Sequence, residues 1–217
     1  YGQCGARVRP IAEGFLMLRV ELEILKKWIR PGSRVLDLGC GDGTLLEALA
    51  ASHDIEGYGL EIDPERITAC IQRGVNVIET DINLGLGHFP DDSFDTVVMT
   101  NSLQALLRPD RTLVEMLRVG KECVVTFPNF GNIQARAYLG LRGRMPVTRQ
   151  LSYQWYDTPN IHFCTIRDFE VLCRDLGIRI LDRATVATGP LSRHLQGIWP
   201  NLFAQTAIYH LSKPQAA

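Results

Sequence analysis

The sequence lacks several patterns that would assign a function at once. Its 217 residues include six cysteines but no CxxC pair, which argues against a zinc site. No Gly-Lys-Ser or Gly-Lys-Thr follows a predicted strand, which excludes a P-loop nucleotide site. No apolar run reaches the ~20 residues of a transmembrane helix, and no signal peptide is visible. Because scattered cysteines also suit a reducing compartment, we expect a cytoplasmic protein that does not bind membranes.

A strong charge of either sign is missing as well. The chain has 23 basic and 24 acidic residues and a net charge of −1, which argues against a nucleic-acid partner. Hydrophobic residues make up 46%, an ordinary share for a globular protein of this length. We therefore expect a single domain over 12–217, preceded by an N-terminal tail, 1–11, of uncertain structure.

Short apolar runs alternate with helical patterns along most of the chain. Leucine and isoleucine spacing predicts helices over 12–29, 45–49, 64–74, 113–119 and 166–175. The predicted strands are 34–38, 57–62, 76–79, 96–99, 123–127, 178–186 and 207–211, the last two as antiparallel neighbours. Strands that alternate with helices and read as continuous apolar runs indicate a parallel sheet covered on both faces. The fold class is thus a Rossmann-like, doubly wound, mostly parallel α/β sheet of about seven strands in three layers.

Two helix starts are marked by capping residues, and one segment breaks the pattern. Asp63 precedes Pro64 as a predicted N-cap, and Thr165 with Asp168 forms a predicted capping box.

The segment 132–162, which precedes this second helix start, shows no regular period, and we interpret it as an insert.

The stretch VLDLGCGDG, residues 35–43, ends a buried strand on a glycine-rich loop. Glycines there let a ligand pass close to the backbone, and the following helix N-terminus favours an anionic group. The spacing is GxGxG, and Thr44 stands where the third glycine of the dinucleotide fingerprint GxGxxG would fall. A nicotinamide or flavin dinucleotide is therefore disfavoured.

Acidic residues at three predicted strand ends indicate a different ligand. Asp37 can hold an ammonium group, Glu61 both hydroxyls of a ribose, and Asp81 the exocyclic amine of adenine. An adenosine that carries a charged amino acid, S-adenosylmethionine, uses all three. Each residue also has a plainer explanation: a loop cap for Asp37, a solvated strand end for Glu61, a turn for Asp81 and helix packing for Gly43.

This arrangement resembles the class I S-adenosylmethionine-dependent methyltransferase family. The resemblance covers roughly 35–127 and includes the approach to the fourth strand, FPDDSFDTVV. It implies S-adenosylmethionine or S-adenosylhomocysteine as the cofactor. The candidate cofactor-binding residues are Asp37, Gly39, Cys40, Gly41, Gly43, Glu61, Ile62, Asp81 and Ile82.

A narrower resemblance is to the methionine biosynthesis protein MetW family. The stretches that carry it are VLDLGCGDG, SLQAL, RVGKECVVTFPNFGN and YQWYDTPNIHFCTIRDFEVLC. This resemblance implies a bacterial cytoplasmic protein of methionine biosynthesis whose partner is homoserine O-acyltransferase (MetX). It assigns no residue to the partner role and leaves open whether the chain is an enzyme.

The insert 132–162 supplies candidates for a lid or a partner interface: Arg136, Tyr153, Trp155, Tyr156 and His162. Arginines suit anionic groups and aromatic residues suit interface cores. Candidate bases for methyl transfer are Tyr153, Tyr156, Asp157 and His162, but none has neighbours that identify a role, and the Asn-Pro-Pro-aromatic motif of amide and adenine methylases is absent. We keep three hypotheses: a cofactor-binding activator or regulator of homoserine acylation, a methyltransferase acting on a small acid or a protein, and, least favoured, a dinucleotide-dependent oxidoreductase.

Overall fold

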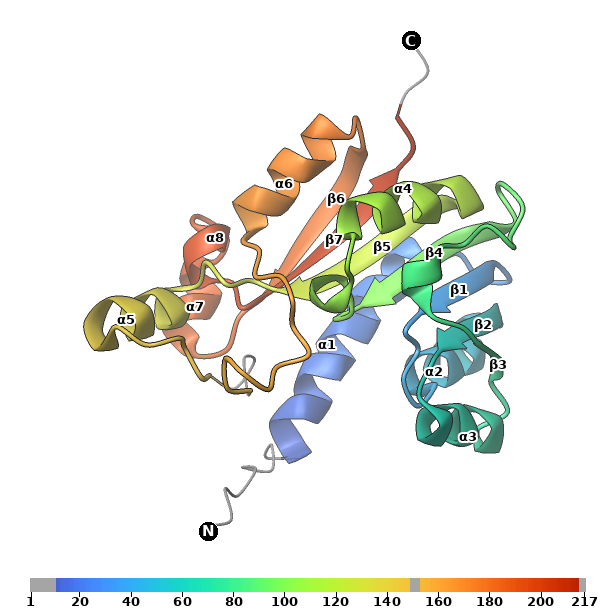
Figure 1. Cartoon of the computed structure of the whole chain (residues 1–217), viewed down its shortest axis with the longest axis horizontal. Coiled ribbons are helices and arrows are strands. Elements are labelled where there is room, and N and C mark those ends of the chain that lie inside the picture. The colour runs from blue at the N-terminus through green and yellow to red at the C-terminus, as the bar shows by residue number, and fades with distance from the viewer. Residues whose placement is uncertain (1–10, 149–152, 215–217) are drawn as a thin grey trace.

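A seven-stranded sheet runs through the molecule (Figure 1). The computed structural model describes residues 11–148 and 153–214. The strands are β1 (Arg34–Leu38), β2 (Glu56–Glu61), β3 (Asn76–Glu79), β4 (Phe94–Thr100), β5 (Gly120–Pro128), β6 (Arg179–Val186) and β7 (Thr206–Ser212). Their order in the sheet is β3-β2-β1-β4-β5-β7-β6, and only the pairings of β7 with β5 and β6 are antiparallel. The predicted doubly wound, mostly parallel sheet with an antiparallel final pair is confirmed.

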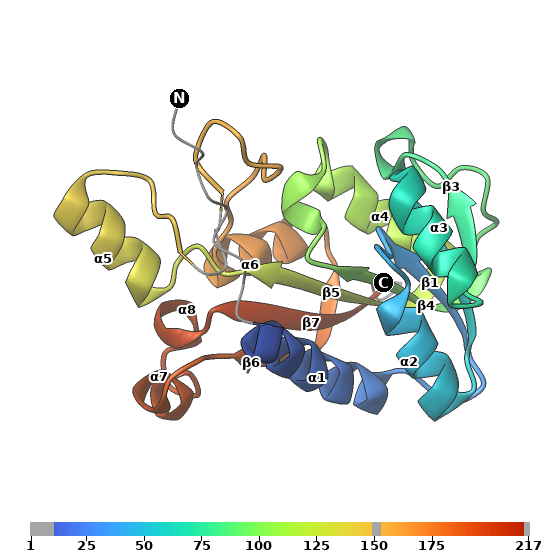
Figure 2. The ribbon, with the colours of Figure 1, turned by 90° about the horizontal axis from the view of Figure 1, so that it is seen from below.

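Helices cover both faces of this sheet. The helices are α1 (Ile11–Trp28), α2 (Thr44–His53), α3 (Pro64–Gln72), α4 (Pro109–Val119), α5 (Ile133–Arg142), α6 (Ile166–Asp175), α7 (Pro190–Leu195) and α8 (Pro200–Phe203). Figure 2 shows α1 and α2 on one face of the sheet and α4 and α6 on the other. Each face has its own buried apolar cluster, so the chain forms the three layers that the sequence predicts.

The predicted helix starts are confirmed in detail. Asp63 accepts hydrogen bonds from the amides of Glu65 and Arg66 at the start of α3. Thr165 and Asp168 form the reciprocal capping box of α6. These short-range signals position α3 and α6 against the sheet, and α3 follows directly on the strand that carries Glu61.

The segment 132–162 contains a helix that its sequence pattern did not predict. Asn132 caps α5 by accepting from the Ala135 amide, and Gly143, with φ 59°, ends it. Ala135 is the buried residue of α5, so the helix shows little apolar periodicity. Figure 1 shows α5 projecting from the end of β5, with α7 and α8 nearby. The short helices α7 and α8 and the 3-10 turns η1 (Ile82–Leu84) and η2 (Leu103–Ala105) were also not predicted.

Some sequence predictions lie outside this description. The tail 1–11 is described only at Ile11, and 149–152 of the insert lie outside the described residues. Within the ranges 11–148 and 153–214, no helix is long and apolar enough to cross a membrane.

Candidate functional site

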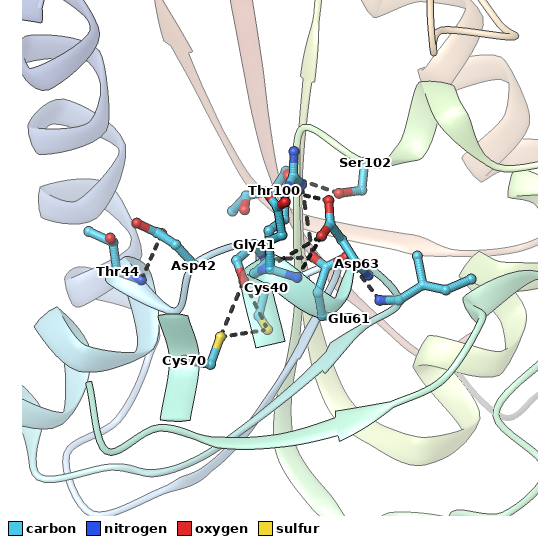
Figure 3. Close-up of polar contacts among 12 residues, drawn as sticks. Cys40, Gly41, Asp42, Thr44, Glu61, Asp63, Cys70, Thr100 and Ser102 are labelled. Carbon is cyan, nitrogen blue, oxygen red and sulfur yellow. Dashed lines mark hydrogen bonds and ion pairs between the residues drawn. The ribbon is translucent and has the colours of Figure 1, made fainter. Parts of the chain in front are cut away.

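The glycine loop lies between β1 and α2, at the carboxyl end of the sheet (Figure 3). Gly39, Gly41 and Gly43 have φ values of 75°, 60° and 79°, which other residues adopt only with strain. A Cβ on Gly39 would lie 2.7 Å from Ser102 Oγ, whereas one on Gly41 would meet nothing within 4 Å. The backbone at Gly41 therefore borders open space, as the passage of a ligand would require.

Gly43 serves packing as well as loop conformation. A Cβ there would lie 3.1 Å from Cys70 Sγ and 3.2 Å from Val75 Cγ2. Helix packing, the plainer explanation, thus accounts for this glycine. Gly43 sets how closely α2 approaches α3.

Glu61 is buried at the end of β2 and is bonded to the loop. The Gly41 amide donates to its Oε2 at 2.9 Å, and the amides of Ile62 and Asp63 donate to its Oε1 at 2.9 and 3.1 Å (Figure 3). Arg66 Nη1 lies 3.9 Å from Oε2. Glu61 is thus no solvated strand end, because it links β2 to the glycine loop. A carboxylate has about four acceptor positions, so bonding to a ribose remains compatible with these contacts and stays a prediction.

Asp37 carries an unsatisfied carboxyl group. Its side chain is 1% exposed, and neither Oδ1 nor Oδ2 has a hydrogen-bond partner among the described residues. Burial, with a smaller contribution from the charge of Glu61, raises the pKa of Asp37 to about 7. Asp37 therefore does not cap the loop. A buried group of this kind is costly unless a donor reaches it, so Asp37 is suited to receive a cationic or hydrogen-bonding ligand.

Asp81 and its neighbours lie beyond the end of β3. The Asp81 carboxylate caps η1 by accepting from the backbone amide and the side-chain Nδ2 of Asn83, both at 2.9 Å. Ile82 is half-buried against the core, whereas Ile62 is 59% exposed after β2. The structure thus gives Asp81 a fixed position and leaves an apolar side chain uncovered beside Glu61. Contact of either with an adenine stays a prediction.

Cys40, a candidate from the sequence, directs its thiol into the core. Cys40 Sγ lies 3.8 Å from Cys70 Sγ, and the Cys70 thiol donates to the Gly41 carbonyl at 3.2 Å (Figure 3). Burial is the main cause that raises the pKa of both thiols. A Cβ on Gly59 would lie 2.3 Å from Cys40 Sγ, so that glycine makes room for the thiol. At Cys40 only the backbone belongs to the loop surface.

The insert candidates form a second group, away from the glycine loop. The aromatic side chains of Tyr153, Trp155 and Tyr156 are exposed, and the last two contact edge to face at 5.7 Å. Arg136 Nε donates to the Gly131 carbonyl at 2.6 Å. His162 is exposed, and only its backbone is fixed. No polar contact joins these side chains to Asp37 or Glu61 among the described residues.

Sequence reasoning missed Gln104, which connects the two groups. The Gln104 carbonyl accepts from the amides of Ile161 and His162 at 2.8 and 3.0 Å, which fixes the end of the insert to η2. Ser102, whose Oγ would lie 2.7 Å from a Cβ on Gly39, precedes η2. The stretch SLQAL was visible as part of the family resemblance, but its residue types indicated no chemistry.

Asn129 was missed as well, and it is a structural junction. It is buried, and its Oδ1 accepts from the amides of Gly131 and Ile166 at 3.0 and 3.3 Å. Its Nδ2 donates to the carbonyls of Asn201 and Ala204 at 3.1 and 2.8 Å. One amide side chain thus fixes the end of β5, the approach to α5, the start of α6 and the segment around α8. This explains the stretch FPNFGN without any ligand.

The strand order, the β1–α2 glycine loop and the acidic residue at the end of β2 define a class I S-adenosylmethionine-dependent methyltransferase fold. A SAM-dependent methyltransferase from Archaeoglobus fulgidus has a TM-score of 0.67 over 91% of this chain and 93% of that chain, at 17% identity. A SAM-dependent methyltransferase from Thermotoga maritima, described as a possible histamine N-methyltransferase, has a TM-score of 0.64 over 93% and 94%, at 20% identity.

The chain belongs to the MetW family, because the family model described as "Methionine biosynthesis protein MetW" matches residues 19–211. A relative in Rhodopirellula baltica, "Bifunctional methionine biosynthesis protein MetXA/MetW", is 36% identical over 208 residues, which cover 92% of this chain and 33% of that protein. The 2-methyl-6-phytyl-1,4-hydroquinone methyltransferase of Synechocystis is 26% identical over 67% of this chain and 49% of that protein. The chain thus spans a third to a half of the length of these curated relatives.

Proposed function

We propose that this chain binds S-adenosylmethionine or S-adenosylhomocysteine at the glycine loop and acts in methionine biosynthesis as an activating or regulatory partner of homoserine O-acyltransferase. The observation that carries the ligand is the buried Asp37 carboxyl, which lacks a donor. It belongs to the strand that ends at the glycine loop, and Gly41 of that loop faces open space. An amino acid's ammonium group would satisfy both of its oxygens.

Other residues at the site would bind the remaining parts of the ligand. Glu61 has acceptor positions for ribose hydroxyls, and Ile62 and Asp81 offer an apolar surface and an acceptor to adenine. Gly43 caps α2 without a side-chain hydrogen bond, and the Thr44 amide donates to Asp42 Oδ1 at 3.2 Å. The positive end of the helix dipole favours the ligand's carboxylate at this N-terminus.

The ligand assignment is tested by calorimetry with S-adenosylhomocysteine, S-adenosylmethionine and NAD. We expect the first two to bind and NAD not to bind. Glu61→Ala should weaken binding by about 1–3 kcal/mol, through lost ribose bonds and a loosened Gly41 amide. Glu65→Ala, at an exposed position four residues further on, is the matched control and should bind as wild type does. Equal affinity in wild type and Glu61→Ala would refute the assignment.

The partner role rests on the Rhodopirellula relative, whose name joins MetXA and MetW functions in one chain. Two activities fused in one protein are commonly activities that work together. The test is co-purification of this chain with the homoserine O-acyltransferase, followed by acyl-transfer assays with each protein alone and with both. We expect a complex whose acylation rate differs from that of the acyltransferase alone. Unchanged rates and separate elution would exclude the partner role.

A second candidate function, methyl transfer to a small acid or a protein, is favoured by one observation. The end of the insert is fixed to the Gln104 carbonyl just after β4, so it borders the same edge of the sheet as the glycine loop. Acceptors of the fold class are expected at that edge. Formation of S-adenosylhomocysteine on mixing the purified chain with S-adenosylmethionine and either homoserine or the acyltransferase would establish this function.

A further inference from the structure

One end of the molecule combines helix α5, the loop that follows it and the α7–α8 segment. Figures 1 and 2 both show α5, α7 and α8 together, beyond the end of β5. Gln205 Nε2 donates to Gln134 Oε1 at 3.4 Å, and Asn129 Nδ2 bonds the Asn201 carbonyl. These contacts join two segments that are about 70 positions apart in sequence into one surface, which we call the arginine–tryptophan face.

This face carries more basic than acidic residues, although Asp157 in the loop after α5 is an exposed acid. The sequence contains no Asp or Glu over 123–156 or over 183–217, although acidic residues outnumber basic ones in the whole chain. Arg142, the last residue of α5, and Arg144, just after the helix, are both exposed. The Arg142 guanidinium lies 4.8 Å from the centre of the Tyr138 ring. Neither arginine forms an ion pair with a described residue. The positive charge of this face is therefore available to a partner.

The segments that make up this face also carry exposed large apolar side chains. Leu141 is 87% exposed, Trp155 71% and Trp199 58%. An open hollow of about 240 Å³ between α5 and the start of α6 is lined by Phe130, Ala135, Leu139 and other residues. Exposed tryptophans and arginines on the segments that also form an apolar hollow have the composition of an interface centre rather than of an ordinary surface.

We propose that the arginine–tryptophan face binds an acidic, partly apolar patch on the homoserine O-acyltransferase. This inference rests on the proposed function and adds the location and the chemistry of the contact. The occupant is argued from the fused relative, in which the two parts belong to one protein, and from charge complementarity, because arginines without internal partners select a carboxylate-bearing surface. A nucleic acid or an anionic membrane is disfavoured by the acidic residues on the rest of the chain, with its net charge of −1.

The test measures the dissociation constant of the complex of this chain with the acyltransferase, for wild type and variants. The face variants are Trp199→Ser, Trp155→Ser and Arg142→Glu combined with Arg144→Glu. The matched controls are Ile71→Ser, on the exposed side of α3, and Lys27→Glu combined with Arg111→Glu, at exposed positions of α1 and α4. Thermal unfolding and S-adenosylhomocysteine binding confirm that each variant is folded.

We expect each tryptophan variant to weaken the complex roughly 30-fold, and the charge reversal to weaken it strongly at low salt and less at high salt. The controls should stay within about 3-fold of wild type. If wild type does not bind the acyltransferase, the proposed partner role itself fails. If wild type binds and the face variants behave as the controls do, the location is wrong. Binding of wild type, but not of the charge reversal, to duplex RNA or to anionic vesicles with the acyltransferase complex unaffected would overturn the choice of partner.

Discussion

Asp37 is the residue whose chemistry depends most on its surroundings. It is buried, it lacks donors and its pKa is raised to about 7. Because this value exceeds 3.8, the ordinary pKa of an Asp, the folded state holds more protons than the unfolded state between these two pH values. The contribution of Asp37 to stability therefore falls as pH rises from about 4 to about 7, and it stays low above that range.

Asp37→Asn should accordingly stabilise the ligand-free protein at pH 8. We expect a gain of about 2–4 kcal/mol at pH 8 that disappears near pH 4, where the wild-type carboxyl is protonated in the folded state. Urea unfolding at both pH values measures it. Asp175→Asn, at the exposed end of α6, is the control and should change stability by less than about 0.5 kcal/mol at either pH. A gain of equal size at pH 4 and pH 8 would mean that charge burial is not its cause.

Asn129 concentrates stability in a single amide. Asn129→Ala should lower the free energy of unfolding by about 3–4 kcal/mol, since two amides and two carbonyls lose a buried partner. Asn76→Ala removes one exposed bond to the Gly57 carbonyl and should cost less than about 1 kcal/mol. Equal urea midpoints for the two variants would contradict the junction role.

At the scale of elements, the start of α6 offers a measurable test. Thr165 Oγ1 accepts from the Asp168 amide, and Asp168 Oδ2 accepts from the Thr165 amide at 2.9 Å. Thr165→Ala should cost about 1 kcal/mol, whereas Thr165→Ser keeps the hydroxyl and should cost much less. Thermal unfolding of both variants measures the difference. Similar losses for Ala and Ser would indicate that packing of the threonine methyl, rather than the cap, stabilises this start.

The sheet and its covering helices could be predicted because their signals are local. Buried strands read as apolar runs, and caps such as Asp63 and Thr165 act within three residues. Helix α5 was not predicted, since it buries little beyond Ala135 and so lacks an apolar stripe. A helix that projects from the core is stabilised by its caps and by contacts at its ends. The spacing of apolar residues does not reveal these features.

In the candidate site, too, some features could be predicted from local sequence signals and others could not. The loop glycines and Glu61 follow from strand ends, because parallel strands bring their carboxyl ends to one edge. The bond between Glu61 and the Gly41 amide joins residues 20 positions apart, and that of Asn129 to Ala204 joins residues 75 apart. No local pattern specifies such pairs. The direction of the Cys40 thiol could not be predicted for a similar reason, since it is set by packing over Gly59.

At the scale of the whole molecule, the glycine loop and the insert are mechanically connected. Gly39 lies close to Ser102, since a Cβ on Gly39 would be 2.7 Å from Ser102 Oγ, and the Gln104 carbonyl accepts from the amides of Ile161 and His162. A ligand that moves the loop would therefore act on the end of the insert, which carries Trp155. Such coupling is typically 1–3 kcal/mol and is reciprocal.

If the proposed function holds, S-adenosylmethionine should change the affinity for the acyltransferase by roughly 5-fold to 150-fold, and the acyltransferase should change cofactor affinity by the same factor. We expect weakening, because restraint of a pathway by its end product is the simplest control. Two titrations measure it, each with and without the other ligand at saturation. Identical constants in all four conditions would show that the two sites are independent.

The position of β7 has a consequence for how this chain folds while it is being synthesised. This strand follows the other six in sequence yet lies between β5 and β6, fully buried along its length. Within the described residues β6 has no sheet neighbour except β7, so the sheet cannot close before residues 206–212 have left the ribosome. Until then the outer edge of β5 lacks the strand with which it pairs in the folded protein. Between the synthesis of β5 and that of β7 the nascent chain thus exposes an aggregation-prone edge, and we expect it to depend on chaperones during that interval.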